Sequence, residues 1–186
     1  MLRHFVADSH FCQNEKQMTR HLFLIGFMGS GKSYQGRRLA EKLGCPFIDL
    51  DAFIVTSEGK SIADIFFESG ETGFRVLESD HLRRLAALPP AVVATGGGTP
   101  CFFDNLEWMK RHGLTVYLRT APDVLFERLR GGKAHRPLLL DLDDEGLRAF
   151  ISERLAARES YYLQADATLE WGQADVAGAL EQMASG

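Results

Sequence analysis

Several features are scarce in this sequence, and each shortage excludes a class of protein. Basic residues do not predominate, because 21 lysines and arginines stand against 25 aspartates and glutamates, a net charge of −4. A nucleic-acid binder needs a basic face, so this balance argues against nucleic acid as a partner. No apolar run approaches the roughly 20 residues that cross a bilayer. Residues 1–20 also lack the apolar block of a secretory signal.

Cysteine is scarce as well. The chain has Cys12, Cys45 and Cys101, an odd number without C-x-x-C spacing. This pattern argues against a disulfide framework or a zinc site and favours reduced thiols in the cytoplasm. A length of 186 residues suits one domain, or one domain with an appendage. We therefore expect a small, mildly acidic cytoplasmic domain, and a small anionic ligand is compatible with this charge.

Short apolar segments alternate with helical patterns along most of the chain. We expect strands at 21–26, 46–50, 91–95 and 114–118, with an edge strand at 167–169. Helices are expected at 32–43, 61–87 (broken near Gly70 and Gly73), 103–112, 122–130, 146–163 and 176–183. β-Branched strands that alternate with helices predict a parallel sheet covered on both faces, hence a three-layer α/β/α fold.

The segment GFMGSGKS, Gly26–Ser33, fits the pattern G-x-x-x-x-G-K-[ST] and lies between an expected strand and an expected helix. Its glycines permit a tight turn whose backbone N–H groups close on phosphate oxygens, and the helix adds its positive end. In such loops the lysine, here Lys32, reaches the β- and γ-phosphates, and the hydroxyl, here Ser33, binds Mg²⁺. The sequence therefore predicts a nucleoside triphosphate site, without specifying the reaction.

Two carboxylates, Asp49 and Asp51, follow in PFIDLDAF at the end of the second expected strand. In a strand this spacing puts both side chains on one side, at the edge where α/β sheets bind ligands. One division of roles directs Asp49 toward the water shell of a metal and Asp51 toward an acceptor hydroxyl. Alternatively, Asp51 is simply the N-cap of the next helix.

Further candidate residues lie at the end of the third strand and on two helices. Thr95 is followed by three glycines, which expose backbone N–H groups and allow a ligand to approach closely. Arg75 and Arg158 lie on expected helices, and the planar fork of arginine suits a carboxylate ligand. An isolated helical arginine is more often a solvated surface residue. These two are candidates only because they occur together with the glycine-rich segment and the other motifs.

The helical pattern disappears in the segment 131–144, which contains two glycines, a proline and several charges. Loops of this length in compact domains are often lids. A lid that closes over the site would bring Arg136 onto the transferring phosphate. Alternatively, Arg136 is a surface residue on a flexible loop.

Taken together, these segments resemble the shikimate kinase family from about Arg20 to Tyr162. The phosphate loop alone is generic, but its combination with further motifs in this order and spacing is highly specific. The matching segments are GFMGSGKS (26–33), FIDLD (47–51), SIADIF (61–66), GETGFRVLE (70–78), TGGG (95–98), RPLL (136–139) and the R-x-x-Y of Arg158–Tyr161.

The resemblance implies Mg²⁺-dependent transfer of the ATP γ-phosphate to the 3-hydroxyl of shikimate, a step in aromatic amino acid biosynthesis. On the acceptor side, it implies that Asp51 orients or deprotonates the attacking hydroxyl. Arg75 and Arg158 would hold the shikimate carboxylate, and the backbone of Gly97 would lie against the ring. Phe66 and Phe74 are either apolar walls of this site or core residues.

On the nucleotide side, the resemblance implies catalytic contacts from Lys32 and Arg136, with Ser33 and Asp49 at the metal. The implied ATP-binding residues are Gly29, Ser30, Gly31, Lys32, Ser33, Tyr34 and Arg136. Tyr34 replaces a smaller residue of the family, which affects packing but not the backbone loop. A nucleotide-contacting arginine of some relatives corresponds to Arg128 or Arg130, and the sequence leaves that choice open.

Residues 1–17 have no counterpart in the family, so we expect an N-terminal extension, with Met18 as the alternative start of a single kinase domain at 18–186. We expect a monomer.

Two other functions remain open: another small-metabolite kinase, such as a gluconate kinase, and a nucleotide-binding switch that phosphorylates no metabolite. The order of the motifs favours the cyclic acid as the acceptor.

Overall fold

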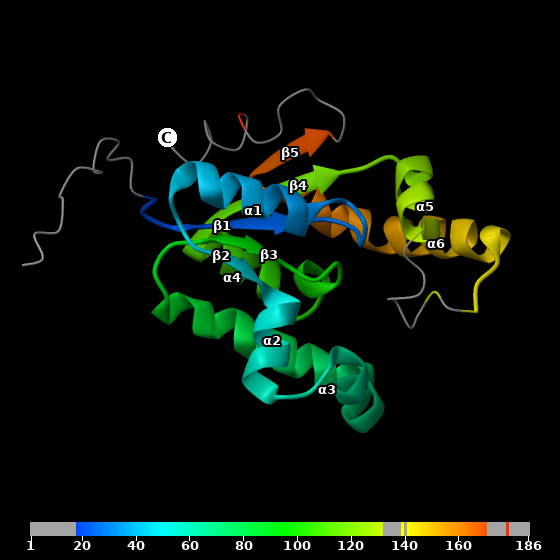
Figure 1. The fold of residues 1–186 in the computed structure, drawn as a ribbon, viewed down its shortest axis with the longest axis horizontal. Coiled ribbons are helices and arrows are strands. Elements are labelled where there is room, and N and C mark those ends of the chain that lie inside the picture. Colours follow the sequence, from blue (N-terminus) through cyan, green and yellow to red (C-terminus); the bar gives the residue numbers. More distant parts are fainter. Residues whose placement is uncertain (1–17, 132–138, 140, 171–177, 179–186) are drawn as a thin grey trace, which may run out of the picture.

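Five parallel strands form the centre of the molecule (Figure 1). The computed structural model describes residues 18–131, 139, 141–170 and 178. The strands are β1 (His21–Ile25), β2 (Phe47–Asp49), β3 (Val92–Ala94), β4 (Gly113–Arg119) and β5 (Ala167–Glu170). They pair in the order β2-β3-β1-β4-β5, with every pair parallel. This sheet confirms the predicted fold class.

Helices follow the strands as the periodicity predicts, except that the helix at 50–58 was not among those expected. They are α1 (Lys32–Leu43), α2 (Leu50–Glu58), α3 (Ile62–Arg84), α4 (Asn105–His112), α5 (Pro122–Gly131) and α6 (Asp144–Tyr162), with 3₁₀ turns η1 (Leu85–Ala87) and η2 (Thr99–Cys101). The predicted break in the third helix is present at Gly70, whose φ of 67° and ψ of −177° are not helical. The helix predicted at 176–183 lies outside the described residues except for 178.

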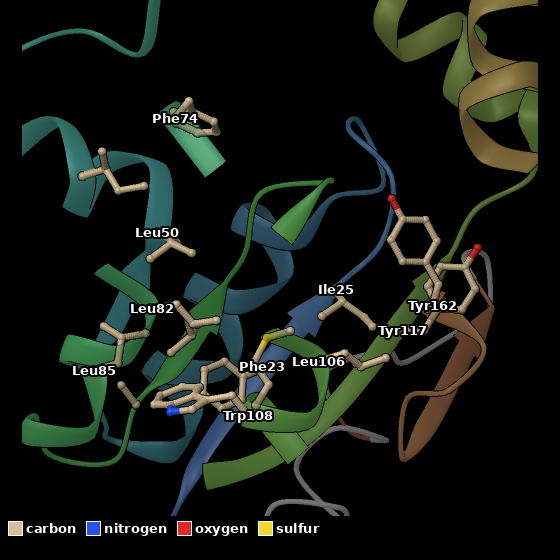
Figure 2. Close-up of a cluster of buried hydrophobic side chains, with 14 of the residues drawn as sticks. Phe23, Ile25, Leu50, Phe74, Leu82, Leu85, Leu106, Trp108, Tyr117 and Tyr162 are labelled. Atoms are coloured by element: carbon tan, nitrogen blue, oxygen red, sulfur yellow. The ribbon is translucent and has the colours of Figure 1, made fainter. Parts of the chain in front are cut away.

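Helices cover both faces of the sheet because alternate side chains of each strand point to opposite sides. From β1, Phe23 and Ile25 join a core with residues of α2, α3, α4 and α6. Leu22 and Leu24 point the other way and pack with α1. Figure 2 shows the first core, where the rings of Phe23 and Trp108 meet edge to face at 6.1 Å between centroids. The central strand is therefore fully buried, which explains its unbroken apolar sequence.

A third core packs α5 and α6 together beside the loop that follows β1. It includes Phe27 of that loop, Leu129 of α5 and Ile151 of α6. In Figure 1, α5 and α6 accordingly lie to the right of the sheet, toward which β1 and β4 point. All five strands thus end at one edge, where ligands of open α/β sheets bind. Within the described residues, no helix has the length and apolarity needed to cross a bilayer.

Candidate active site

The loop between β1 and α1 has the backbone of a phosphate-binding turn. Gly26, Gly29 and Gly31 have φ values of 139°, 80° and 94°, in the region that favours glycine. A Cβ atom at Gly26 would also lie 2.9 Å from the Leu118 carbonyl oxygen. Gly31 is the N-cap of α1 and has no side chain to bond the first-turn N–H groups. That end of the helix is therefore open to an anion.

Lys32 lies across this loop. Its ammonium group donates to the carbonyl oxygens of Gly26 and Phe27, each at 2.8 Å, and the residue is 8% exposed. Ser30 is buried inside the turn, and its N–H donates to Phe27 O at 3.2 Å. Lys32 thus holds a positive charge over the turn that the sequence predicted to bind phosphate.

Of the two candidate arginines on α5, Arg128 contacts the phosphate loop. Its guanidinium donates to the Gly29 carbonyl at 2.9 Å, so it reaches the phosphate loop from α5. Arg130 instead pairs with Asp144 at 3.0 Å in an exposed ion pair. Arg128 thus lies against the phosphate loop, whereas Arg130 forms an ion pair at the surface.

Asp49 connects the phosphate loop to the next helix. Its Oδ2 accepts a hydrogen bond from the Ser33 hydroxyl at 2.6 Å, so the two predicted metal residues are adjacent. Its Oδ1 accepts from the Ala52 N–H at 3.4 Å, which makes Asp49 the N-cap of α2. The alternative that Asp51 is this cap is wrong. The strand ends at Asp49, so Asp51 projects from the first helical turn and not from a strand.

The Asp51 carboxylate has a pKa raised from its ordinary value to about 6. Its removal from bulk water by the surrounding protein is the main cause, followed by the negative charges of Glu78 and Asp49. Lys32 and Arg75 oppose the shift. Asp51 is nevertheless exposed, so the surrounding protein removes only part of the hydration of its carboxylate. Near neutral pH, Asp51 is ionised but basic enough to accept a proton.

Each glycine of the 96–98 triplet adjoins a different set of neighbours. A Cβ at Gly96 would lie 2.6 Å from Glu78 Oε1 and 3.3 Å from Asp51 Oδ1. At Gly97 it would lie 3.3 Å from the Met28 N and 3.5 Å from Arg158 Nη1. At Gly98 it would lie 2.7 Å from Arg75 Nη2. The triplet therefore brings the phosphate loop, the candidate base and both candidate arginines to three consecutive residues.

Arg75 is a buried, fixed cation, not the solvated surface residue that an isolated helical arginine usually is. It is 8% exposed and donates to Glu78 at 2.8 Å and to Glu71 at 3.1 Å. Its guanidinium carbon lies 5.1 Å from the ring centroid of Phe74 and 4.4 Å from that of Phe102. Its Nε is buried without a hydrogen-bond partner in the described part of the chain. The guanidinium is thus held by aromatic rings and carboxylates.

Glu78 closes the GETGFRVLE motif, but the sequence analysis gave it no role. It is fully buried, and besides Arg75 it accepts from the Thr99 hydroxyl at 2.6 Å. The available signal was the i, i+3 spacing of Arg75 and Glu78 in FRVLE, which places both on one face of α3. Phe74 is buried in the first core, and its ring stacks on that of Phe66 with 4.5 Å between the centroids, so this pair is part of the core.

The remaining predicted site residues differ in where they lie. Arg158 is half-buried on α6 with its guanidinium carbon 6.0 Å from the ring centroid of Phe27, beside the phosphate loop. The side chain of Tyr34 is 60% exposed and turns toward Arg38, whose Nη1 donates to its hydroxyl at 3.5 Å. Arg136, with most of the predicted lid, lies outside the described residues.

The chain thus has a phosphate loop at the carboxyl edge of a parallel sheet. Beside this loop lies a candidate acceptor region that contains both arginines and carboxylates. Together these features define the fold and site of a P-loop kinase. The family model for shikimate kinase matches residues 28–182. The chain belongs to the shikimate kinase family. A shikimate kinase from Phocaeicola vulgatus is 49% identical over 148 residues, which cover 80% of this chain and 84% of the relative.

Solved structures agree with this assignment. A shikimate kinase from Bacteroides thetaiotaomicron, 43% identical, matches with a TM-score of 0.75 over 81% of this chain and 85% of that chain. A shikimate kinase from Acinetobacter baumannii in complex with shikimate, 36% identical, matches with a TM-score of 0.77 over 88% of this chain and 89% of that chain. A gluconokinase from Sinorhizobium meliloti is only 21% identical at a TM-score of 0.52, so it shares the fold alone.

Proposed function

We propose that this chain transfers the γ-phosphoryl group of ATP to the 3-hydroxyl of shikimate, giving shikimate 3-phosphate and ADP. The observation that carries the proposal is the Gly96–Gly98 triplet. Within it, Gly97 approaches the phosphate loop and Arg158, while its neighbours approach Asp51 and Arg75. Phosphoryl transfer depends mainly on positioning and on neutralising charge, and this arrangement supplies both.

On the acceptor side, the two arginines would hold the carboxylate of the acid. Arg75 and Arg158 approach adjacent glycines, whose Cα atoms are about 3.8 Å apart, so their guanidinium groups converge on one short stretch. Asp51 would accept a hydrogen bond from the attacking hydroxyl and take its proton as the oxygen–phosphorus bond forms. Its pKa of about 6 leaves it ionised, and so able to do this, near neutral pH.

On the nucleotide side, the backbone of the phosphate loop would enclose the β- and γ-phosphates. Lys32 would exchange its bonds to the Gly26 and Phe27 carbonyls for phosphate oxygens. Arg128 would stand beside the nucleotide from α5, and the family resemblance adds Arg136 as a further cation. These cations would neutralise the charge that develops as the phosphoryl group moves.

Mg²⁺ is the metal that fits the oxygen ligands at the end of the loop. The Ser33 hydroxyl and the Asp49 carboxylate lie 2.6 Å apart, and Mg²⁺ is typically held by one or two such groups with phosphates and water. When bound, the metal neutralises phosphate charge. We extend the proposal to a monomeric cytoplasmic enzyme whose kinase domain runs from 18 to 186, preceded by an extension at 1–17.

A coupled assay of ADP release tests this function. ATP and Mg²⁺ with shikimate should release ADP at a rate proportional to enzyme, and omission of shikimate or addition of EDTA should abolish it. Gluconate in place of shikimate separates the proposal from a gluconate kinase. ADP release that shikimate does not stimulate would favour a nucleotide-binding switch and overturn the proposal.

The pH dependence of the reaction should follow the ionisation of Asp51. Because the ionised carboxylate is the active form, kcat/KM for shikimate should rise with pH through about 6 and level off above it. At pH values well below about 6, kcat/KM should fall about tenfold for each further decrease of one pH unit. The measurement is kcat/KM across a buffer series of constant ionic strength. A profile that stays flat between about pH 5 and about pH 7 would show that Asp51 is not the group that titrates.

A further inference from the structure

Tyr162 is a buried residue next to the site to which neither the sequence motifs nor the proposed mechanism assigns a role. It is the last residue of α6, fully buried, and its hydroxyl donates to the Gly97 carbonyl at 2.5 Å. Its ring packs on that of Tyr117 at 5.0 Å between centroids, and Figure 2 shows the two rings side by side. The tyrosine of the R-x-x-Y motif, Tyr161, is instead 40% exposed.

The partner of this hydroxyl, Gly97, is the point where the two halves of the site meet. A Cβ at Gly97 would lie 3.3 Å from the Met28 N and 3.5 Å from the Gly26 carbonyl oxygen, both in the phosphate loop. On its other side it would lie 3.5 Å from Arg158 Nη1. A small shift of Gly97 therefore changes the spacing between the nucleotide and the acceptor.

Tyr162 also contacts Arg158, which precedes it by four residues and so lies on the same face of α6. The Arg158 guanidinium is close enough to the Tyr162 hydroxyl to act on its pKa, which it lowers. Burial is the main cause that raises the pKa of the Tyr162 hydroxyl above its ordinary value, so the hydroxyl stays protonated and remains a donor to Gly97. One side chain thus contacts both the backbone of the triplet and the arginine of the acceptor site.

We propose that Tyr162 is a positioning residue for phosphoryl transfer, which fixes the Gly97 backbone and Arg158 relative to the phosphate loop. This inference rests on the proposed function of the same site. Tyr162 itself touches neither reacting atom. Its effect is geometric, because a displacement of about 1 Å between reacting groups costs an enzyme about 100-fold in rate.

The test is Tyr162→Phe, which removes the hydroxyl and keeps the ring that packs on Tyr117. The matched control is Tyr117→Phe, since Tyr117 is also buried and its hydroxyl makes no hydrogen bond within the described residues. We expect Tyr162→Phe to lower kcat/KM for shikimate about tenfold or more and to leave KM for ATP within about twofold. Tyr117→Phe should change neither constant by more than about twofold.

Thermal unfolding and ADP binding, measured on both variants, separate positioning from stability. A purely structural role predicts a lower Tm for Tyr162→Phe with unchanged kinetic constants at temperatures where the protein is folded, and that result would overturn the inference. A rise in KM for ATP as large as the fall in kcat/KM for shikimate would overturn it as well, because it would place the defect in nucleotide binding. The unmutated enzyme is assayed in parallel and tests the proposed function itself. If that enzyme is inactive with shikimate, the proposed function is wrong, whatever the variants show.

Discussion

Replacement of Lys32 by methionine is expected to lower kcat by about 10³-fold, or about 4 kcal/mol of barrier. Methionine keeps an unbranched side chain of similar length but removes the charge that lies over the phosphate loop. Lys32 is 8% exposed and bonds two carbonyls of the loop, so its ammonium is already held where phosphate oxygens would arrive. A fixed charge of this kind stabilises a transition state without reorganisation during the reaction.

The measurement is kcat at saturating ATP and shikimate, together with the Kd for ATP, which separates transfer from binding. The matched control is Lys42→Met, which removes the same charge from an exposed position in the last turn of the same helix. It should leave kcat unchanged within about twofold and cost only a few tenths of a kcal/mol of stability. Turnover of Lys32→Met within about tenfold of the parent would refute the assignment of Lys32.

Replacement of Arg75 by alanine is expected to raise KM for shikimate by about 100-fold while KM for ATP stays within about threefold. The acceptor carboxylate loses the planar fork that adjoins Gly98, whereas the phosphate loop keeps its own contacts. The variant should also unfold more easily. Glu78 is fully buried, and removal of the cation from a buried pair costs about 3–5 kcal/mol.

A double variant separates these two effects. Arg75→Met with Glu78→Gln leaves no buried unpaired charge, since the remaining partner, Glu71, is exposed, so it should recover most of the Tm while KM for shikimate stays high. Arg84→Ala, an exposed arginine on the same helix, serves as the control and should change both constants little. If affinity for ATP fell as far as affinity for shikimate, Arg75 would not belong to the acceptor site.

The parts of this structure that local chemistry determines could be predicted from the sequence. The phosphate loop is such a part, because its glycines, lysine and serine act within eight consecutive residues between a strand and a helix. The break of α3 at Gly70 and the end of α1 at Gly44, with φ of 62°, follow from glycine in the same way. Alternation of apolar strands and helices was sufficient for the parallel sheet.

Contacts between distant segments could not be predicted. The glycine triplet suggested only that a ligand approaches, whereas the structure gives each glycine a separate neighbour, from Glu78 to Arg158. Burial of Arg75 depends on Phe102, 27 positions away, and on a glutamate whose own burial no local pattern indicates. For the same reason, Tyr162 and not Tyr161 reaches Gly97, since one residue of helical rotation decides which side chain is buried.

Asp49 performs two tasks with its two oxygens. One accepts from Ser33 at the proposed metal, and the other caps α2, the helix whose first turn carries Asp51. Whatever binds at Ser33 therefore acts on the same side chain that holds the start of this helix. The proposed metal residue Ser33 and the helix that carries the proposed base are thus linked through one carboxylate. A ligand that drew the Asp49 carboxylate toward Ser33 would therefore also be felt at the start of α2.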